Sequence, residues 1–311
     1  MKLIIRIDDV GYTPVHNLGS WRAIEEGIAT SADVMLDTPG TEEALLRLRS
    51  YPWISVGWHT HFWGSPVLPA EKVPTLVRGN GHFRQDLSTA SDVSEDEALQ
   101  ELHAQLERCI RIYGNVPCCC EFSFSPAVPF GSAMHRVMEE YGIAWGTCSS
   151  DPELMPGSDL SQLVPGGTDS KKMQIPPIVA QDKWKDRRIV MANNVSCAAM
   201  EDSLADALAY DPVGCFLAHA DELLTRNRDE IFFTAWHPGY VDHYVMYDGD
   251  QGLFAKNFLL IRPIDVEALC DPRMKKWIED NKIELVSFAD ALYDTRNYQN
   301  HLRACGSPLA V

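Results

Sequence analysis

The stretch LIIRIDD, residues 3–9, decides the fold class of this chain. It begins with a short, mostly β-branched apolar run, which is typical of a buried strand, and it ends in two adjacent acids. After a turn at Gly11, apolar side chains recur at helical spacing over residues 15–28. A buried strand that is followed by a helix indicates the repeating unit of a parallel α/β sheet.

The same alternation continues along the rest of the chain. We expect further strands over residues 32–36, 53–58, 116–124, 143–146, 188–191, 231–236 and 283–287. We expect further helices over residues 41–49, 95–113, 132–141, 198–209 and 264–280, and from residue 288 onward. Ser94 and Glu97 fit a capping box that opens the helix over residues 95–113.

Two segments, residues 64–91 and 149–185, are rich in turn-forming residues and carry no clear periodicity. A loop as long as the first usually carries function. The chain contains no internal repeat, low-complexity tract or linker. We therefore predict one α/β domain over residues 1–311, a (β/α) barrel of the deacetylase type with mostly parallel strands joined by right-handed crossovers.

The composition argues against several classes of partner. With 27 basic and 44 acidic residues the formal net charge is −17, which disfavours nucleic acid or an anionic membrane. No apolar stretch approaches the roughly 18 residues of a membrane span, and the N-terminus is unlike a signal peptide. Nine scattered cysteines, an odd number, favour a reducing compartment. We expect a cytoplasmic protein that acts on a small molecule and, if it assembles, forms a homodimer.

Three polar clusters each follow a predicted strand, at the end where a barrel of this kind builds its site. Asp8 and Asp9 repel each other unless a cation or a shared proton separates them, so one could bind a metal beside a neighbouring base. A pair of acids that caps a βα turn is the alternative. His59 and His61 are two residues apart in an extended segment and can face one centre, which suits zinc and similar ions. His237, before a Pro-Gly turn, could ligate or donate a proton.

The run Cys118-Cys119-Cys120-Glu121 is unusual. Strand parity places Cys119 and Glu121 on one face, and Cys118 and Cys120 on the other with two phenylalanines. The phenylalanines favour packing against helices, so we expect Cys119 and Glu121 to face the barrel lumen. Three consecutive cysteines on a strand cannot all reach one tetrahedral ion, and a buried free thiol packs as a small apolar residue.

Aromatic side chains lie beside the predicted site. Trp58, Trp63 and Trp236 are neighbours of its histidines, and Tyr240 follows the Pro-Gly turn. Aromatic faces are natural platforms for sugar rings, so we predict that these four residues bind substrate, with ordinary core packing as the alternative. We assign the remaining seven histidines, including His16, to the surface or the core.

Together these motifs resemble the YdjC-like family, also called the chitooligosaccharide deacetylase family. The matching pieces are residues 7–11, 57–59, 66–69, 81–83, 237–240 and 262–287, so the likeness covers nearly the whole chain. The resemblance implies a barrel related to polysaccharide deacetylases that hydrolyses the N-acetyl group of an amino sugar or oligosaccharide. It implies a divalent metal ion, for which we expect zinc or magnesium. By position, Asp9 and His59 resemble metal ligands, Asp8 the base, and His237 the acid or its orienting partner.

The chain departs from the family pattern at one metal ligand. The family supplies its second His from a pattern like Asp-x-His, whereas the matching stretch here is Glu121-Phe122-Ser123. Glu121, Cys119 or His61 completes the site, or the metal binds weakly through waters, or metal and catalysis have been lost. Two further functions stay open: a catalytically silent carbohydrate-binding barrel, and a hydrolase that acts on a different acylated amine or an ester.

Overall fold

One sheet organises the computed structural model, which describes residues 1–62, 64–120, 124–145, 189–193, 204–225, 231–247 and 257–311. Its strands are β1 (Lys2–Val10), β2 (Ser31–Val34), β3 (Ser55–Trp58), β4 (Cys119–Cys120), β5 (Ala144–Trp145), β6 (Ile189–Asn193), β7 (Ile231–Trp236) and β8 (Glu284–Leu285). Their order is β5-β4-β3-β2-β1-β7-β6, with β8 paired to β1, and all of these pairings are parallel. The predicted α/β fold is confirmed. Among the described residues no pairing of β5 with β6 closes a barrel.

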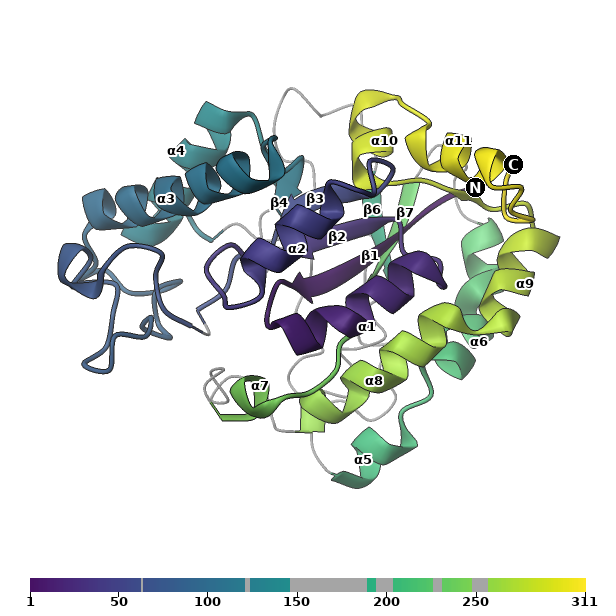
Figure 1. Cartoon of the computed structure of the whole chain (residues 1–311), viewed down its shortest axis with the longest axis horizontal. Helices are drawn as coiled ribbons and strands as arrows, with labels where there is room; N and C mark the ends of the chain where they lie inside the picture. The colour runs from purple at the N-terminus through teal and green to yellow at the C-terminus, as the bar shows by residue number, and fades with distance from the viewer. Residues whose placement is uncertain (63, 121–123, 146–188, 194–203, 226–230, 248–256) are drawn as a thin grey trace.

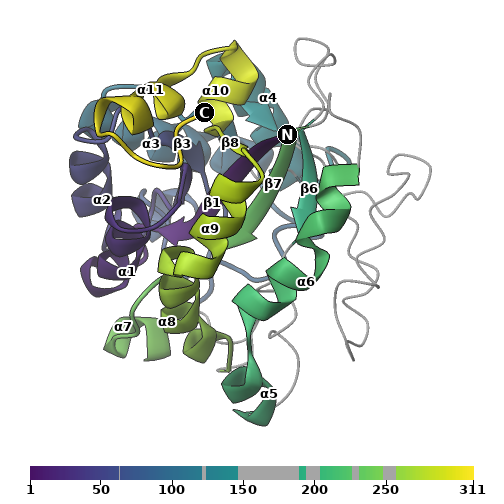
Figure 2. The ribbon, with the colours of Figure 1, turned by 90° about the vertical axis from the view of Figure 1, so that its right-hand side faces the viewer.

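Helices cover the outside of this sheet (Figure 1). They are α1 (Pro14–Glu25), α2 (Thr41–Leu48), α3 (Glu95–Tyr113), α4 (Pro129–Tyr141), α5 (Leu204–Ala209), α6 (Pro212–Thr225), α7 (His243–Tyr247), α8 (Asn257–Cys270), α9 (Pro272–Asp280), α10 (Phe288–Tyr293) and α11 (Asn297–Ala304). Neighbouring helices pack in the sequence α4, α3, α2, α1, α8 and α6, so the outer layer is continuous. Figure 2 shows α6 on the side of the sheet that carries β7 and β6, and α8 packs against both α6 and α1.

Side chains alternate along the strands between two cores. Those that face the helices join the larger core, which includes Cys120. A smaller core is formed mainly by inward-facing side chains of five strands, Ile4, Cys119, Ala144, Ile189, Phe233 and Ala235. The predicted inward position of Cys119 is thus confirmed, while Glu121 lies outside the described residues. Arg6 and Asp8 continue the inward face of β1, so the lumen turns from apolar to ionisable toward the C-terminal ends of the strands.

The prediction of one helix over residues 264–280 is wrong. The chain forms α8, which starts at Asn257 and contains Pro263, and then a separate helix α9. The break lies at Asp271, whose side chain accepts a hydrogen bond from the backbone N–H of Arg273 at 2.7 Å. Pro272, which has no N–H to donate, occupies the first turn of α9. These two residues together stop one helix and start the next.

The loop over residues 64–91 is irregular, as predicted, with a short 3-10 turn (Ala70–Lys72). Two carboxylates on α3 hold it. Glu101 accepts hydrogen bonds from the backbone N–H groups of Val67 at 2.8 Å and Leu68 at 3.0 Å. Glu97 accepts from the backbone N–H and the hydroxyl of Thr75, both at 2.7 Å. Ser94 caps α3, but Glu97 bonds the loop instead of returning to Ser94, so the predicted capping box is only half formed.

Glu101→Gln tests the hydrogen bonds that join α3 to the loop over residues 64–91. Burial raises the pKa of Glu101 to about 7, against hydrogen bonds that lower it. Because this exceeds the ordinary value of 4.5, the stabilisation from protonated Glu101 is complete below about pH 4.5 and is lost as the pH rises through about 7. From pH 5 to pH 8 the free energy of unfolding of the wild type should fall by about 2–3 kcal/mol more than that of the variant, because the amide at position 101 does not titrate. Urea unfolding at both pH values measures this, and parallel profiles would contradict it.

Two other observations concern the predicted environment. In the part of the chain that the structure describes, no helix has the length and hydropathy needed to cross a membrane. The cysteines there are free thiols: Cys109, Cys118, Cys119, Cys120, Cys215, Cys270 and Cys305.

Candidate active site

The C-terminal ends of β1, β2 and β3 bring three ionisable side chains together. One carboxylate oxygen of Asp8, one of Asp33 and one imidazole nitrogen of His59 all lie within 4.8 Å of one another. All three residues are buried. Two carboxylates and an imidazole form a donor set that fits a divalent cation such as zinc, manganese or magnesium.

Gly57 makes room for the Asp33 carboxylate. The two residues are partners in the pairing of β2 with β3, and a Cβ atom at Gly57 would lie 2.0 Å from Oδ1 of Asp33. The carboxylate therefore lies across the backbone of the neighbouring strand. Any side chain at position 57 would displace it.

If this group of residues holds a cation, Gly57→Ala should lower the metal content of the protein, and it should cost about 1–3 kcal/mol of unfolding free energy. Elemental analysis and urea unfolding measure the two effects. Gly79→Ala is the matched control, because a Cβ atom there would meet nothing within 4 Å. If both variants retain wild-type metal content, Gly57 has no role in placing Asp33.

A buried arginine from the same strand holds Asp8. Nε and Nη2 of Arg6 donate to Oδ1 and Oδ2 of Asp8 at 2.7 and 2.9 Å. Nε of Arg6 also lies 3.8 Å from Oδ2 of Asp33, and its guanidinium lies 5.1 Å from the ring centroid of Phe233. One guanidinium thus bridges two acids and rests on an aromatic ring, which its planar, delocalised charge allows.

Asp9 belongs to a second set of contacts. Its Oδ2 lies 2.7 Å from Nη2 of Arg262, and its Oδ1 lies 2.8 Å from Nε2 of His59. The backbone φ of Asp9 is +60°, which is uncommon for a residue with a side chain. This interrupts the strand alternation, so adjacent Asp8 and Asp9 both approach His59. Burial raises the pKa of Asp9, but Arg262 and the hydrogen bond from His59 together hold it well below its usual value.

Arg262 connects Asp9 to the helix α1. Its Nη1 donates to Nε2 of His16 at 3.1 Å. Burial and the charge of Arg262 lower the pKa of His16 to about 3, so this imidazole is neutral and can accept the bond. A Cβ atom at Gly239 would lie 2.1 Å from Nε2 of His16, so the turn after His237 must be glycine to fit against the ring. Of the two places that the sequence left open for His16, the surface and the core, the structure shows the core.

His237 also lies close to Asp8. Its Nε2 is 3.6 Å from Oδ2 of Asp8, and its backbone N–H donates to Oδ2 of Asp265 at 2.8 Å. The hydroxyl of Tyr210 donates to the other oxygen of Asp265 at 2.7 Å. Burial lowers the pKa of His237 to about 4, although Asp8 and Asp9 oppose the shift. The imidazole is therefore neutral at physiological pH.

Comparison with known proteins identifies the family. The sequence model described as YdjC-like protein matches residues 2–280. The chain belongs to the YdjC-like family. The chain is 26% identical over 297 residues to carbohydrate deacetylase 2 of Listeria innocua, an alignment that covers 93% of this chain and 98% of the relative.

Other relatives of this YdjC-like protein match a shorter region. A carbohydrate deacetylase of Brevibacillus brevis is 39% identical over 111 residues, 35% of this chain and 44% of the relative. The chitooligosaccharide deacetylase of Serratia marcescens is 30% identical over 118 residues, 37% and 46% of the two chains. In these alignments the chain spans less than half of the relative's length. A crystal structure of a putative cellobiose-phosphate cleavage protein from Enterococcus faecalis shares the fold, with a TM-score of 0.62, 21% identity and coverage of 93% and 98%.

In this YdjC-like protein, His61, a predicted candidate for a metal ligand, contacts Asp37. Its Nε2 lies 2.6 Å from Oδ1 of Asp37. Asp37 and His61 each follow the end of a strand by three residues, β2 at Val34 and β3 at Trp58. His61 is not among the residues that converge as a ligand group.

Other predicted site residues lie away from the cluster. Trp58 and Trp236 have no exposed surface and pack in the larger core, with their indole N–H groups bonded to Gln105 and Thr234. A sugar platform needs an exposed ring face, so the prediction for these two tryptophans is corrected. Each precedes a site histidine by one residue and therefore faces the opposite side of the sheet. Trp63, Glu121 and Ser123 lie outside the described residues, and the hydroxyl of Tyr240 lies 3.4 Å from Nη1 of Arg22.

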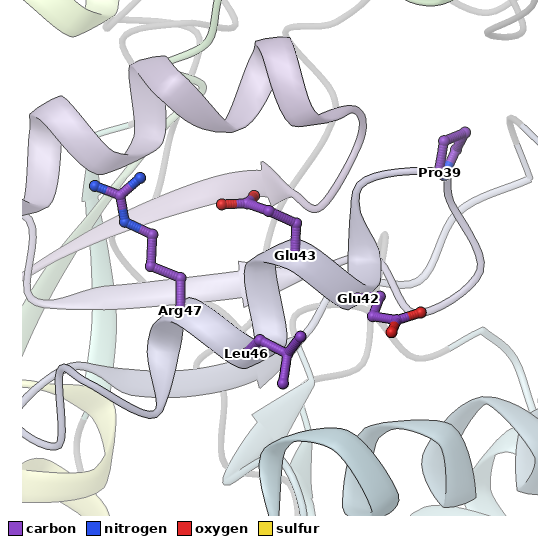
Figure 3. A pocket seen from close by; sticks show the side chains of 5 residues that line it. All are labelled: Pro39, Glu42, Glu43, Leu46 and Arg47. Atoms are coloured by element: carbon purple, nitrogen blue, oxygen red, sulfur yellow. The ribbon is translucent and has the colours of Figure 1, made fainter.

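A surface hollow lies on α2, away from this cluster (Figure 3). It is lined by Pro39, Glu42, Glu43, Leu46 and Arg47. Glu43 accepts hydrogen bonds from Asn17 at 2.7 Å and from the indole of Trp21 at 3.1 Å, and the guanidinium of Arg47 lies 4.8 Å from a Trp21 ring centroid. These side chains hold α2 against α1. The side chains that line the hollow do not include a convergent group of metal ligands like the one between β1, β2 and β3.

Four residues of the site were not predicted from the sequence: Arg6, Asp33, Arg262 and Asp265. Two of them carried a signal. Arg6 and Asp33 are charged residues inside predicted apolar strands, and a charge on such a strand must face a partner in the interior. Arg262 and Asp265 lie on a helix, and the sequence indicated them only as part of the stretch over residues 262–287 that resembles the family.

Proposed function

We propose that this YdjC-like protein is a metal-dependent hydrolase that removes the acetyl group from an N-acetylated amino sugar or oligosaccharide. The convergence of Asp8, Asp33 and His59 carries the proposal, because it lies at the C-terminal ends of parallel strands, where such folds build their sites. The names of the relatives, carbohydrate deacetylase and chitooligosaccharide deacetylase, support the substrate class. We also propose one domain, because β1 and β8, from opposite ends of the chain, pair in one sheet.

The charge of the cluster supports a bound cation. Three acids, Asp8, Asp9 and Asp33, meet two arginines, Arg6 and Arg262. Counted at formal charge with neutral imidazoles, three negative and two positive charges leave a net charge of −1. Buried charge without compensation is costly, so a cation bound here would stabilise the site.

The contacts favour roles for Asp8 and Asp9 that differ from the predicted ones. Asp8 joins His59 as a ligand, and Asp33 takes the position that the sequence left open for Glu121, Cys119 or His61. Asp9 instead forms an ion pair with Arg262 and contacts His59. A carboxylate in this position orients a metal-binding imidazole.

A divalent cation held there would polarise the acetyl carbonyl and lower the pKa of a nearby water. The chain's own proton-transfer group is His237, whose neutral imidazole can accept a proton at Nε2 and return it to the departing amine. Asp265 holds the backbone of His237 in place. Asp8, the base expected from the sequence, already binds Arg6 through both oxygens, which makes it the poorer proton acceptor.

Acetate release tests the proposal. Chitooligosaccharides of one to four N-acetylated units are offered to the protein as purified, after dialysis against EDTA, and after return of zinc, manganese or magnesium, with metal content measured in parallel. We expect turnover to be lost with the metal and restored by one of these ions. His237→Gln should keep the metal and lose turnover.

Two results would contradict the proposal. Full turnover by metal-stripped protein would remove the cation from the mechanism. Sugar binding without acetate release, with every ion tested, would instead support a catalytically silent carbohydrate-binding protein.

A further inference from the structure

Arg6 contacts two of the three residues that we propose as cation ligands. It binds both oxygens of Asp8 and lies 3.8 Å from an oxygen of Asp33. It is fully buried, with the ring of Phe233 against its guanidinium and the apolar lumen core on the same face of β1. A positive charge is therefore already present where the divalent cation would bind.

A guanidinium and a divalent cation compete for the same carboxylates. An ion bound to Asp8 and Asp33 would lie within a few ångströms of the Arg6 charge, in a buried site where solvent screening is weak. Ion binding must therefore overcome this repulsion or move Arg6 away from Asp8. The same ion pair keeps two buried carboxylates compensated when no metal is bound.

We infer that Arg6 is a built-in competitor of the divalent cation, which stabilises the metal-free site and holds the affinity for metal down. This inference rests on the proposed function, because it concerns the same ion. It assigns opposite effects to one side chain: loss of Arg6 should weaken the metal-free fold and strengthen metal binding. A purely structural arginine would give only the first effect.

Competition titrations with a fluorescent chelator test the inference. The metal-free wild type, Arg6→Met and Arg6→Lys are each titrated with zinc and with manganese, and their urea unfolding is measured. Arg6→Met should be less stable without metal and yet bind zinc at least about tenfold more tightly, because the competing charge is gone. Arg6→Lys keeps the charge and should bind within a few-fold of the wild type.

A second measurement is made on the wild type and uses a variant only to assign a resonance. The Arg6 Nε–H resonance of ¹⁵N-arginine-labelled wild type, assigned by its loss in Arg6→Lys, should shift on zinc addition as its bond to Asp8 weakens. A static resonance at saturating zinc, or equal or weaker zinc binding by folded Arg6→Met, would overturn the inference alone. Absence of zinc and manganese binding in every protein would overturn the proposed cation as well, and acetate release by metal-stripped protein would then show whether hydrolysis survives without it.

Discussion

Asp33→Asn is expected to lose the bound cation and to lower kcat/KM for an acetylated sugar by at least about 100-fold. Asp33 is one of the three residues whose ligand atoms lie within 4.8 Å of one another. A neutral amide is a weaker ligand than a carboxylate and removes one charge from the cluster. Loss of a group that merely orients a ligand typically costs about 10–100-fold, so loss of a ligand should cost no less. Elemental analysis and initial rates on the same preparations measure both effects.

Asp37→Asn is the matched control for that variant. Asp37 follows the same strand, its side chain is also buried, and it contacts His61 instead of the proposed ligands. It should retain the metal and stay within a few-fold of wild-type kcat/KM. If the two variants behave alike, or if Asp33→Asn keeps metal and turnover, Asp33 is not a ligand.

Arg262→Met should lower the free energy of unfolding by about 3–5 kcal/mol, the usual cost of removing one partner from a buried ion pair. It leaves Asp9 buried without its arginine and removes the donor to His16. Because the wild-type pKa of Asp9 lies well below 3.8, the stabilisation is complete above about pH 4 and is lost as the pH falls further. The deficit of the variant should thus be largest near neutral pH. Urea unfolding at pH 7 and pH 3 measures it.

Glu267→Gln provides the comparison on the same helix. Glu267 pairs with Arg22 on the surface, where both side chains are partly solvated. Exposed pairs contribute little, so this variant should lose less than about 1 kcal/mol. If Arg262→Met loses no more than Glu267→Gln, the buried network around Asp9 does not stabilise the fold.

Much of the fold could be predicted from local sequence pattern. The strand over residues 231–236 and the helix over residues 95–113 have the bounds that periodicity and capping indicated. Parity placed Cys119 inward and Cys120 outward, and the same rule, applied to Trp58 and Trp236, would have placed both tryptophans in the outer core. The helices over residues 212–225 and 243–247 were missed, and the helix predicted from residue 288 onward is divided into one over residues 288–293 and another over residues 297–304. The single helix predicted over residues 264–280 failed because a proline in a helix and a proline that starts a helix look alike in one sequence.

The sequence alone determined which strands end in residues that can bind a metal or transfer a proton. It thereby located Asp8, Asp9, His59 and His237 at one end of a parallel sheet. Only the tertiary structure decided which of them meet. The three proposed ligands are separated by about 25 residues each, and strand register and the space above Gly57 bring Asp33 to Asp8 and His59. The arginines that balance the acids approach along the lumen and from α8. Contacts of this kind depend on packing between elements, and no local spacing in the sequence encodes them.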